Sequence, residues 1–256
     1  MGVTGLSGRS VIVTGAASGI GRATALRFAA EAANVVVADL DAGGAKSVVD
    51  AIEAAGGTAV AVTGDLSDSA VVDRVTATAV DTFGGVDVLV NNAGVMDSMS
   101  ATADVTDAEW ERVLRINLTA PFLLTRSVLP HMLAAGRGAI VTTASEASLR
   151  GSAAGTAYTV SKHGLLGLTR SLAVMYRDKG IRANAIAPGG TITNITNGIG
   201  VDGEAHGPAV IGRHMTNMGR VSDPEEQAAA IVYLASDAAS SVNGVVLPVD
   251  NGWAAV

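Results

Sequence analysis

The chain has 256 residues, a length that suits one α/β domain and leaves little room for two. Apolar residues make up 48% of it, and the formal net charge of −7, without any basic cluster, argues against a nucleic-acid-binding surface. It contains no cysteine, which excludes disulfides, thiolate catalysis and cysteine-ligated zinc.

The apolar runs are short throughout. None approaches the roughly 20 residues needed to span a bilayer, and the run Val11-Ile12-Val13 is too short for a secretory signal peptide. We therefore expect a cytoplasmic protein, built as one domain over residues 1–256, that binds neither a membrane nor nucleic acid. The four histidines have no spacing typical of a metal site, so we expect no bound metal.

Short β-branched runs alternate with longer, alanine-rich stretches along the chain. Strands are predicted at Ser10–Thr14, Val35–Asp39, Thr58–Thr63, Val86–Asn91, Ala139–Thr143, Ala183–Ala187 and Val245–Val249. Helices are expected between them, for example at Arg22–Ala32, Ala70–Phe83 and Gly164–Arg177. This alternation predicts parallel strands joined by crossover helices, and the continuous apolar character of the strands predicts a sheet covered on both faces.

Two helix starts and one irregular segment complete the pattern. Thr106 followed by Glu109 forms a capping box, and Asp223-Pro224 is a favourable helix entry. The segment 194–218 carries five glycines and little periodicity. Because a long loop in a compact domain is usually functional, we expect this segment to be a lid over a site.

A glycine-rich turn follows the first predicted strand and opens a helix. Its residues are Gly15, Ser18, Gly19, Ile20 and Gly21. Glycines allow the backbone to approach a pyrophosphate, and the start of the helix offers free N–H groups with a partial positive charge. The spacing differs from GxGxxG, so the turn alone is weak evidence, but its place after the first strand favours dinucleotide binding.

Asp39 sharpens the cofactor prediction. It ends the second predicted strand, where a carboxylate can accept hydrogen bonds from the adenosine ribose hydroxyls and repels a 2′-phosphate. Ser18 and Leu40 offer no cation to that phosphate. The sequence therefore favours NAD over NADP, although a strand-end aspartate can also be only a turn residue.

With these motifs in order, the chain resembles the short-chain dehydrogenase/reductase family over nearly its whole length. The glycine turn is similar to that family's TGxxxGxG, Asn91-Asn92-Ala93-Gly94 to its NNAG, and Tyr158 to Lys162 to its YxxxK, with Ser145 thirteen residues upstream. The chain departs from the family pattern at Glu146, after the serine, and at Asp250-Asn251-Gly252, where the family has a double glycine.

The resemblance implies a Rossmann-type, doubly wound parallel sheet of about seven strands in a three-layer αβα arrangement, a frequent homotetramer, and a set of site residues. The catalytic residues would be Asn117, Ser145, Tyr158 and Lys162. Besides the glycine turn and Asp39, the cofactor would contact Asp65, Leu66, Asn92, Ala93, Gly94, Tyr158, Lys162, Pro188, Gly189, Thr191 and Thr193. Asn117 would hold a water that passes protons toward Lys162.

The YxxxK spacing places Tyr158 and Lys162 one helical turn apart on the same face. A tyrosine with the ordinary pKa of about 10 is a poor base at neutral pH, and a nearby ammonium favours its phenolate. Tyr158 could then exchange a proton with an alcohol or ketone whose oxygen Ser145 orients. Such a pair also occurs on ordinary amphipathic helices, so only its combination with the cofactor motif predicts catalysis.

The sequence says less about the substrate. We expect a small, largely uncharged secondary alcohol or ketone, with cyclic compounds among the candidates, in a pocket lined by Met96, Glu146, Leu149 and Ile195, because the lid offers few cations besides Arg213. A 3-oxoacyl thioester reductase is the alternative enzyme, and a non-catalytic NAD-binding sensor or scaffold is the alternative of another class. Glu111 and Arg115 are expected to form a surface ion pair.

Overall fold

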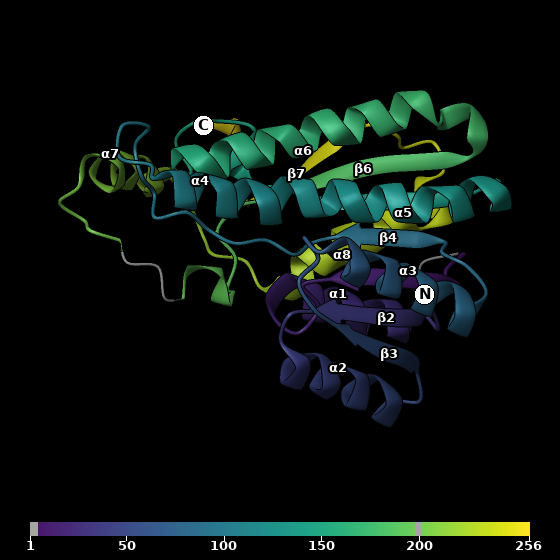
Figure 1. Ribbon diagram of the computed structural model, residues 1–256. Helices are drawn as coiled ribbons and strands as arrows, with labels where there is room; N and C mark the ends of the chain where they lie inside the picture. The colour runs from purple at the N-terminus through teal and green to yellow at the C-terminus, as the bar shows by residue number, and fades with distance from the viewer. Residues whose placement is uncertain (1–4, 198–200) are drawn as a thin grey trace.

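The computed structural model describes residues 5–197 and 201–256. Its strands form one sheet in which all neighbouring strands run parallel, in the order β3-β2-β1-β4-β5-β6-β7 (Figure 1). The strands are β1 (Ser10–Thr14), β2 (Asn34–Asp39), β3 (Thr58–Thr63), β4 (Val88–Asn91), β5 (Gly138–Thr143), β6 (Ile181–Pro188) and β7 (Val246–Val249). The predicted Rossmann-type sheet of about seven strands is confirmed.

Helices connect the strands and cover both faces of the sheet. They are α1 (Gly19–Ala30), α2 (Ala42–Ala54), α3 (Ser69–Phe83), α4 (Asp107–Leu114), α5 (Ala120–Ala135), α6 (Thr156–Met175), α7 (His206–His214) and α8 (Pro224–Ala235). A single π-helical turn, Arg115–Thr119, joins α4 to α5. None of the helices within the described residues is long and apolar enough to cross a membrane.

The side chains of each strand alternate between two apolar cores, as the period of two in a strand requires. In β1, Val11 and Val13 face the core shared with α1, α2 and α8, whereas Ile12 faces the core shared with α3, α5 and α6. Both faces are therefore buried, which explains why the strands are continuously apolar rather than alternating.

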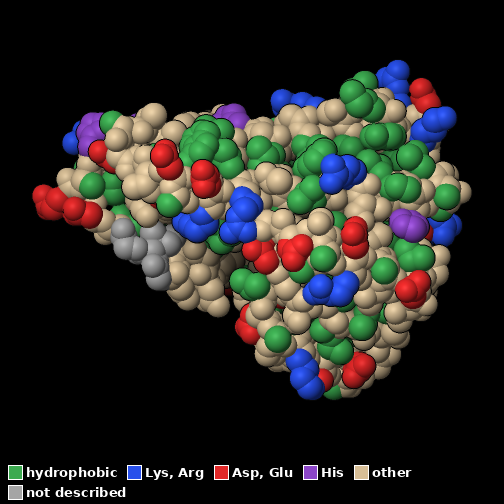
Figure 2. Space-filling view, viewed as in Figure 1, with side chains coloured by type: hydrophobic (Ala, Val, Ile, Leu, Met, Phe, Trp, Pro, Cys, Tyr) green, Lys and Arg blue, Asp and Glu red, His purple; other side chains and the backbone are tan. Residues whose placement is uncertain are grey.

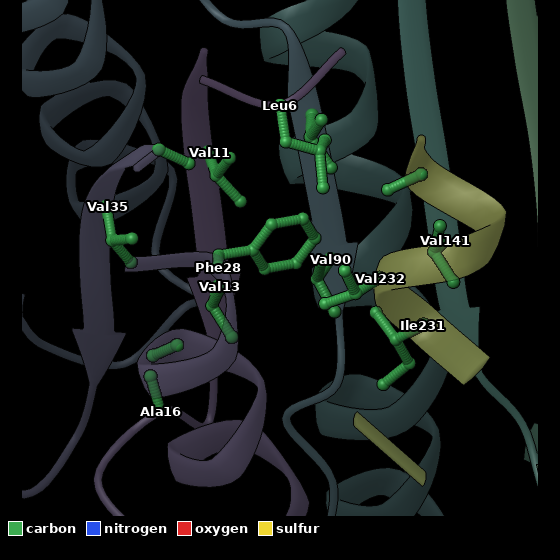
Figure 3. Close-up of a cluster of buried hydrophobic side chains, with 14 of the residues drawn as sticks. Leu6, Val11, Val13, Ala16, Phe28, Val35, Val90, Val141, Ile231 and Val232 are labelled. Atoms are coloured by element: carbon green, nitrogen blue, oxygen red, sulfur yellow. The ribbon is translucent and has the colours of Figure 1, made fainter. Parts of the chain in front are cut away.

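Phe28 anchors α1 to the first of these cores. Its ring is fully buried and lies between β1 and β4, with Ile231 and Val232 of α8 beside it (Figure 3). Removing such a buried ring typically costs about 3–5 kcal/mol. Because α1 begins within the glycine turn, at Gly19, this packing also holds the turn at the carboxyl end of β1.

The structure differs from the sequence prediction at two helices. Helix α6 begins at Thr156 rather than Gly164, because a carboxylate distant in sequence, that of Asp97, caps its first turn. The predicted lid contains the nine-residue helix α7 and two short 3-10 turns instead of a continuous loop. Positions 198–200 of that lid lie outside the described residues.

Candidate active site

A cleft of about 540 Å³ opens where the strand order reverses, between β1 and β4. In open parallel sheets this switch point is where ligands bind. Thr14 holds the two strand ends together, because its hydroxyl donates to the Val90 carbonyl at 3.2 Å and accepts the N–H groups of Asn92 and Ala93 at 2.9 and 3.0 Å. Figure 2 shows the surface hollowed between the segment that carries α7 and the body around β2 and β3.

The glycine turn forms the floor at one end of the cleft. Gly15 has a φ of +62°, which favours glycine. Gly21 packs so closely that a Cβ atom there would lie 2.0 Å from the Gly15 carbonyl oxygen. Gly15, Ser18, Gly19 and Ile20 line the cleft, whereas Gly21 lies behind it and lets α1 approach the turn.

Asp39 stands at the cleft wall with its carboxylate fixed. One oxygen accepts the Ala17 N–H of the glycine turn at 2.8 Å, and the other accepts the Asp41 N–H at 2.9 Å. The next residue, Leu40, also lines the cleft and is 74% exposed. This end of the cleft thus presents one oriented carboxylate next to an apolar side chain.

Asp65 is held by an arginine that the sequence analysis had assigned elsewhere. Arg115 lies 2.8 Å from the Asp65 carboxylate, and both residues contact the Ser67 hydroxyl. The Ser67 hydrogen bonds, followed by that of Arg115, lower the pKa of Asp65 to about 2. The predicted Glu111–Arg115 surface pair was therefore wrong. Arg115 lines the cleft because the π-helical turn directs it back toward the end of β3.

Tyr158, Lys162 and Ser145 meet at the other end of the cleft. Helix α6 carries the first two on one buried face, with the Lys162 ammonium 5.4 Å from the centre of the Tyr158 ring. The ammonium also donates to the Thr143 carbonyl at 2.9 Å. Ser145 follows β5, accepts the Ala147 N–H at 3.1 Å and is hydrogen-bonded to Tyr158.

Burial dominates the electrostatics of this group. It raises the pKa of Tyr158 to about 12, against the opposing effect of the Ser145 hydrogen bond, and it lowers the pKa of Lys162 to about 8. Lys162 therefore keeps its positive charge at neutral pH. A phenolate at Tyr158 requires positive charge close by, which the Lys162 ammonium provides in part.

Asn117 lies fully buried in the π-helical turn, next to these groups. Its amide oxygen accepts the Val95 N–H at 2.8 Å, and its amide nitrogen donates to the Val95 carbonyl at 2.9 Å and to Ser161 at 3.2 Å. The side chain thus ties the segment after β4 to α6. Asn117 is not among the residues that line the cleft.

Asp97 positions the start of α6 from the same segment. It is 1% exposed, and its carboxylate accepts the N–H groups of Gly155 and Tyr158 at 3.2 and 2.9 Å and that of Met99 at 3.0 Å. Burial raises the pKa of this carboxyl group. Sequence reasoning missed Asp97, because no local pattern links residue 97 to residue 155.

The chain after β6 forms another wall of the cleft. Pro188, Gly189, Thr191, Thr193 and Ile195 line it. The two ends of the lid are joined at its base, where Thr191 pairs with Ser222: the Ser222 N–H donates to the Gly190 carbonyl at 2.8 Å and the Ile192 N–H to the Ser222 carbonyl at 3.0 Å. Asn251, with a φ of +56°, donates from its side chain to Ser222 at 2.8 Å.

The four residues predicted for the substrate pocket lie in different places. Ile195 lines the cleft. Met96 packs with Met215 and Met218 of the lid against an apolar cluster that contains Tyr158 and Trp253. Leu149 is 39% exposed, and Glu146 is buried away from the cleft beside Arg150. Glu146 and Leu149 lie in and directly after the short 3-10 turn that follows Ser145, and sequence periodicity does not show which way their side chains point.

Most residues predicted for the cofactor lie in this one cleft, including Asp65, Leu66, Asn92, Ala93 and Gly94. The cleft also contains residues that the sequence analysis did not select, among them Arg112, Arg115, Ile116 and Pro121. Arg112 and Arg115 are three residues apart, a spacing that puts two side chains on the same face of a helix. This spacing could have indicated from the sequence that the two arginines line the same site.

The residues of the cleft fit a dinucleotide. Helix α1 begins at Gly19 in the cleft lining, and the start of a helix attracts a pyrophosphate. The oriented Asp39 carboxylate suits a ribose diol at one end, and the Tyr158–Lys162 pair suits a reacting alcohol at the other.

Comparison with known proteins agrees with this geometry. A family model described as enoyl-(acyl carrier protein) reductase matches residues 15–254. The chain is 43% identical to a cis-4-hydroxycyclohexanecarboxylate dehydrogenase of Sinomonas cyclohexanicum, over 97% of each chain. It is 38% identical to 3beta-hydroxysteroid dehydrogenase 2 of Eggerthella lenta, over 98% of this chain and 96% of the relative. It is also 38% identical to a cyclohexanol dehydrogenase of an Acinetobacter strain, over 94% and 93%.

Solved structures show the same fold. Levodione reductase superposes with a TM-score of 0.89 at 36% identity, over 98% of this chain and 99% of the other. A putative NAD(P)-dependent gluconate 5-dehydrogenase of Beutenbergia cavernae, with NADP bound at low occupancy, superposes with a TM-score of 0.87 at 42% identity over the whole of both chains.

Proposed function

Because the chain belongs to the short-chain dehydrogenase/reductase family, we propose that it transfers a hydride between NAD(H) and a secondary alcohol or ketone, with Tyr158 as the general acid and base. The observation that carries this proposal is the meeting of Tyr158, Ser145 and Lys162 in the cleft that also holds the glycine turn. The lid over residues 194–218 would cover the substrate. We also propose that the protein is cytoplasmic and forms a homotetramer.

In alcohol oxidation, Ser145 would donate a hydrogen bond to the substrate oxygen and hold it beside Tyr158. The Tyr158 oxygen would then take the hydroxyl proton as the carbinol carbon loses its hydride and becomes a carbonyl carbon. In the reverse direction Tyr158 returns that proton. The nicotinamide ring, when bound, accepts or supplies the hydride.

Lys162 would act through charge and through proton supply. Its ammonium favours the Tyr158 phenolate, because an opposite charge within about 6 Å favours the charged form. Asn117, by the family resemblance, would hold a water that relays protons toward Lys162. The Asn117 side chain is already bonded to Val95 in both directions, so its amide keeps this part of the wall fixed.

The preference for NAD rests on Asp39. Its oriented carboxylate and the neighbouring Leu40 would hydrogen-bond a ribose diol and repel a 2′-phosphate. The relative with bound NADP makes this the first point to test. Titrations of the purified protein with NADH and NADPH should show tight NADH binding and weak NADPH binding. Equal affinities would contradict the assignment.

For the substrate we propose a small, largely uncharged cyclic secondary alcohol or its ketone. Two of the relatives are dehydrogenases of a hydroxycyclohexanecarboxylate and of cyclohexanol. The methionines Met96, Met215 and Met218 beside Tyr158 offer a deformable apolar wall for such a ring. Cyclohexanol and cis-4-hydroxycyclohexanecarboxylate are therefore the first two probes, and turnover of the carboxylate alone would contradict an uncharged substrate.

The mechanism is tested by Tyr158→Phe with Tyr176→Phe as the matched control, since Tyr176 lies at the far end of α6. Loss of general acid–base catalysis should lower cyclohexanol turnover by roughly 10²- to 10⁴-fold, with NADH affinity retained. The control should keep the parental rate. An unchanged cyclohexanol rate in Tyr158→Phe would contradict Tyr158 as the general acid and base, whereas absence of turnover in the parent with NADH binding intact would favour a non-catalytic NAD-binding role.

A further inference from the structure

Arg115 and Asp65 form an ion pair in the cleft, and nothing in the proposed mechanism uses Arg115. Arg115 belongs to the π-helical turn between α4 and α5, whereas Asp65 follows β3, and both residues line the cleft. The Arg115 guanidinium lies 2.8 Å from one Asp65 oxygen. The pair therefore joins two separate elements of the cleft wall.

The Asp65 carboxylate is held by contacts at both of its oxygens. The oxygen that does not meet Arg115 accepts the Ser67 N–H at 2.9 Å and the Ser67 hydroxyl at 2.7 Å. Arg115 donates to the same hydroxyl. The Ser67 hydrogen bonds, and then that of Arg115, hold the pKa of this carboxyl group at about 2. At neutral pH Asp65 is therefore a fixed carboxylate that only accepts hydrogen bonds.

The turn that carries Arg115 is also fixed. Two residues further along, Asn117 is fully buried and is hydrogen-bonded to Val95 in both directions and to Ser161. The side chains of Arg115 and Asp65 remain accessible, at 49% and 46% exposed. Because an exposed ion pair contributes little to the free energy of unfolding, its contact with a ligand is the effect to consider.

The order of the strands indicates which part of a dinucleotide would reach this pair. The glycine turn follows β1, Asp39 ends β2 and Asp65 follows β3, and the three strands are neighbours in the sheet. The ends of β2 and β3 are level, because Asp39 pairs with Thr63. With a pyrophosphate at the turn and a ribose at Asp39, the base would lie beside Asp65, Arg115 and the apolar Leu66, which also lines the cleft.

Charge gives Arg115 a further role at this end of the cleft. Asp39 and Asp65 both line it, and a pyrophosphate would bring more negative charge, so a ligand with phosphates meets like charges that repel it. Arg112 also lines the cleft, but it donates to the Met96 carbonyl at 3.0 Å. Arg115 is thus the cation that is paired with the carboxylate next to the base.

We propose that Arg115 is a positioning residue for the base of the cofactor, because it holds the Asp65 carboxylate as an acceptor for the adenine amino group and offsets its charge. Hypoxanthine has a carbonyl oxygen in place of that amino group. This oxygen would meet the carboxylate as a second acceptor and weaken binding, so the pair makes the site selective for adenine. This inference rests on the proposed binding of NAD(H) but not on the proposed substrate.

The test compares NADH with reduced nicotinamide hypoxanthine dinucleotide, which differs from NADH only in the base. Both ligands fluoresce through the same dihydronicotinamide ring, so fluorescence titrations give both dissociation constants. The parent should bind NADH roughly tenfold or more tightly than the hypoxanthine analogue. In Arg115→Ala, the affinity for NADH should fall by roughly 5- to 20-fold, and the preference for NADH should fall below about threefold.

The ratio of the two dissociation constants separates positioning of the base from a purely structural role. If Arg115 only supported the turn that carries Asn117, its loss would weaken both ligands equally, and the unchanged ratio would overturn the inference. Arg74→Ala is the matched control, since Arg74 also contacts the end of β3, by donating to the Thr63 carbonyl at 3.0 Å, but does not line the cleft. It should keep both parental constants. Arg115→Lys retains the positive charge and should restore part of the preference.

Asp65→Asn is the second variant if Arg115→Ala fails to fold. An asparagine amide can both accept and donate, so it can pair with either base, and the preference for NADH should be lost. In the Asp65→Asn background, Arg115→Ala should change the affinity for NADH by less than about twofold, because Arg115 acts through Asp65. A preference that persists in Asp65→Asn would refute the inference.

The parent protein distinguishes failure of this inference from failure of the proposed function. A parent that binds neither ligand would overturn the proposed cofactor together with the inference. A parent that binds both ligands equally well would leave NAD(H) as the cofactor and refute only the selectivity for adenine assigned to Arg115 and Asp65.

Discussion

Asp97 offers the sharpest test of how this fold positions its reacting groups. The change is Asp97→Ala, which removes the acceptor for three backbone N–H groups, those of Met99, Gly155 and Tyr158. Each buried donor left without an acceptor costs about 1–3 kcal/mol. Relief of the burial of the carboxylate, which is evident in its raised pKa, offsets part of this cost. We expect a net loss of about 3 kcal/mol in the free energy of unfolding.

The assay is urea-induced unfolding, with Asp68→Ala as the matched control. Asp68 caps α3 through one exposed N–H group, that of Ala70, and its loss should cost about 1 kcal/mol. If Asp97→Ala destabilises the protein no more than Asp68→Ala does, the capping argument fails.

A second readout separates positioning from stability alone. The negative charge of Asp97 is one of the causes that raise the pKa of Tyr158. Its removal should lower that pKa, so that the base form of Tyr158 is reached at lower pH and the rising limb of the pH–rate profile for cyclohexanol oxidation moves to lower pH. A profile that stays in place would show that Asp97 acts on α6 through structure only.

Three further predictions use other parts of the molecule. Replacing Asp39 with Ala and Leu40 with Arg should shift relative affinity from NADH toward NADPH by roughly 10- to 100-fold in titrations, and no shift would contradict the role of this wall. The folded pKa of Glu146 is raised from 4.5 to about 7, so the parent should lose stability as pH rises between these values; Glu146→Gln should lack this loss in urea titrations. Arg182 donates to the carbonyls of Leu234, Ala235, Ser236 and Val242, so Arg182→Ala should cost about 2–4 kcal/mol, against less than about 1 for the exposed Arg74→Ala.

The sheet was predictable because its strands are buried on both faces. Continuous runs such as Val35–Asp39 leave few alternatives to a central parallel strand, and the structure extends this one by a single residue, to Asn34. The cleft residues could also be predicted in their order, because the carboxyl ends of parallel strands meet at one edge.

What the sequence did not show depends on contacts between distant residues. The YxxxK spacing predicts helix at Tyr158, but the start of α6 at Thr156 and its cap by Asp97 depend on a residue about sixty positions earlier. Arg115 was assigned to a neighbour four residues away, but the structure pairs it with Asp65, fifty positions earlier. In the sequence, Glu146 and Asp250 are two separate departures from the family pattern. Only the fold brings them close enough for Asp250 to affect the pKa of Glu146.

The bridge between Thr191 and Ser222 has a consequence for how relatives of this protein can diverge. The bridge closes the intervening chain into a loop whose two ends are fixed to each other. The Asn251 side chain also holds one of these ends, because it donates a hydrogen bond to Ser222. The entropy of closing such a loop grows slowly, by only about 0.6 kcal/mol for each doubling of its length. Insertions between Ile195 and Met215, beyond the residues that line the cleft, should therefore cost little free energy of unfolding, so this part of the loop can differ in length between homologues while the cleft beneath it is kept.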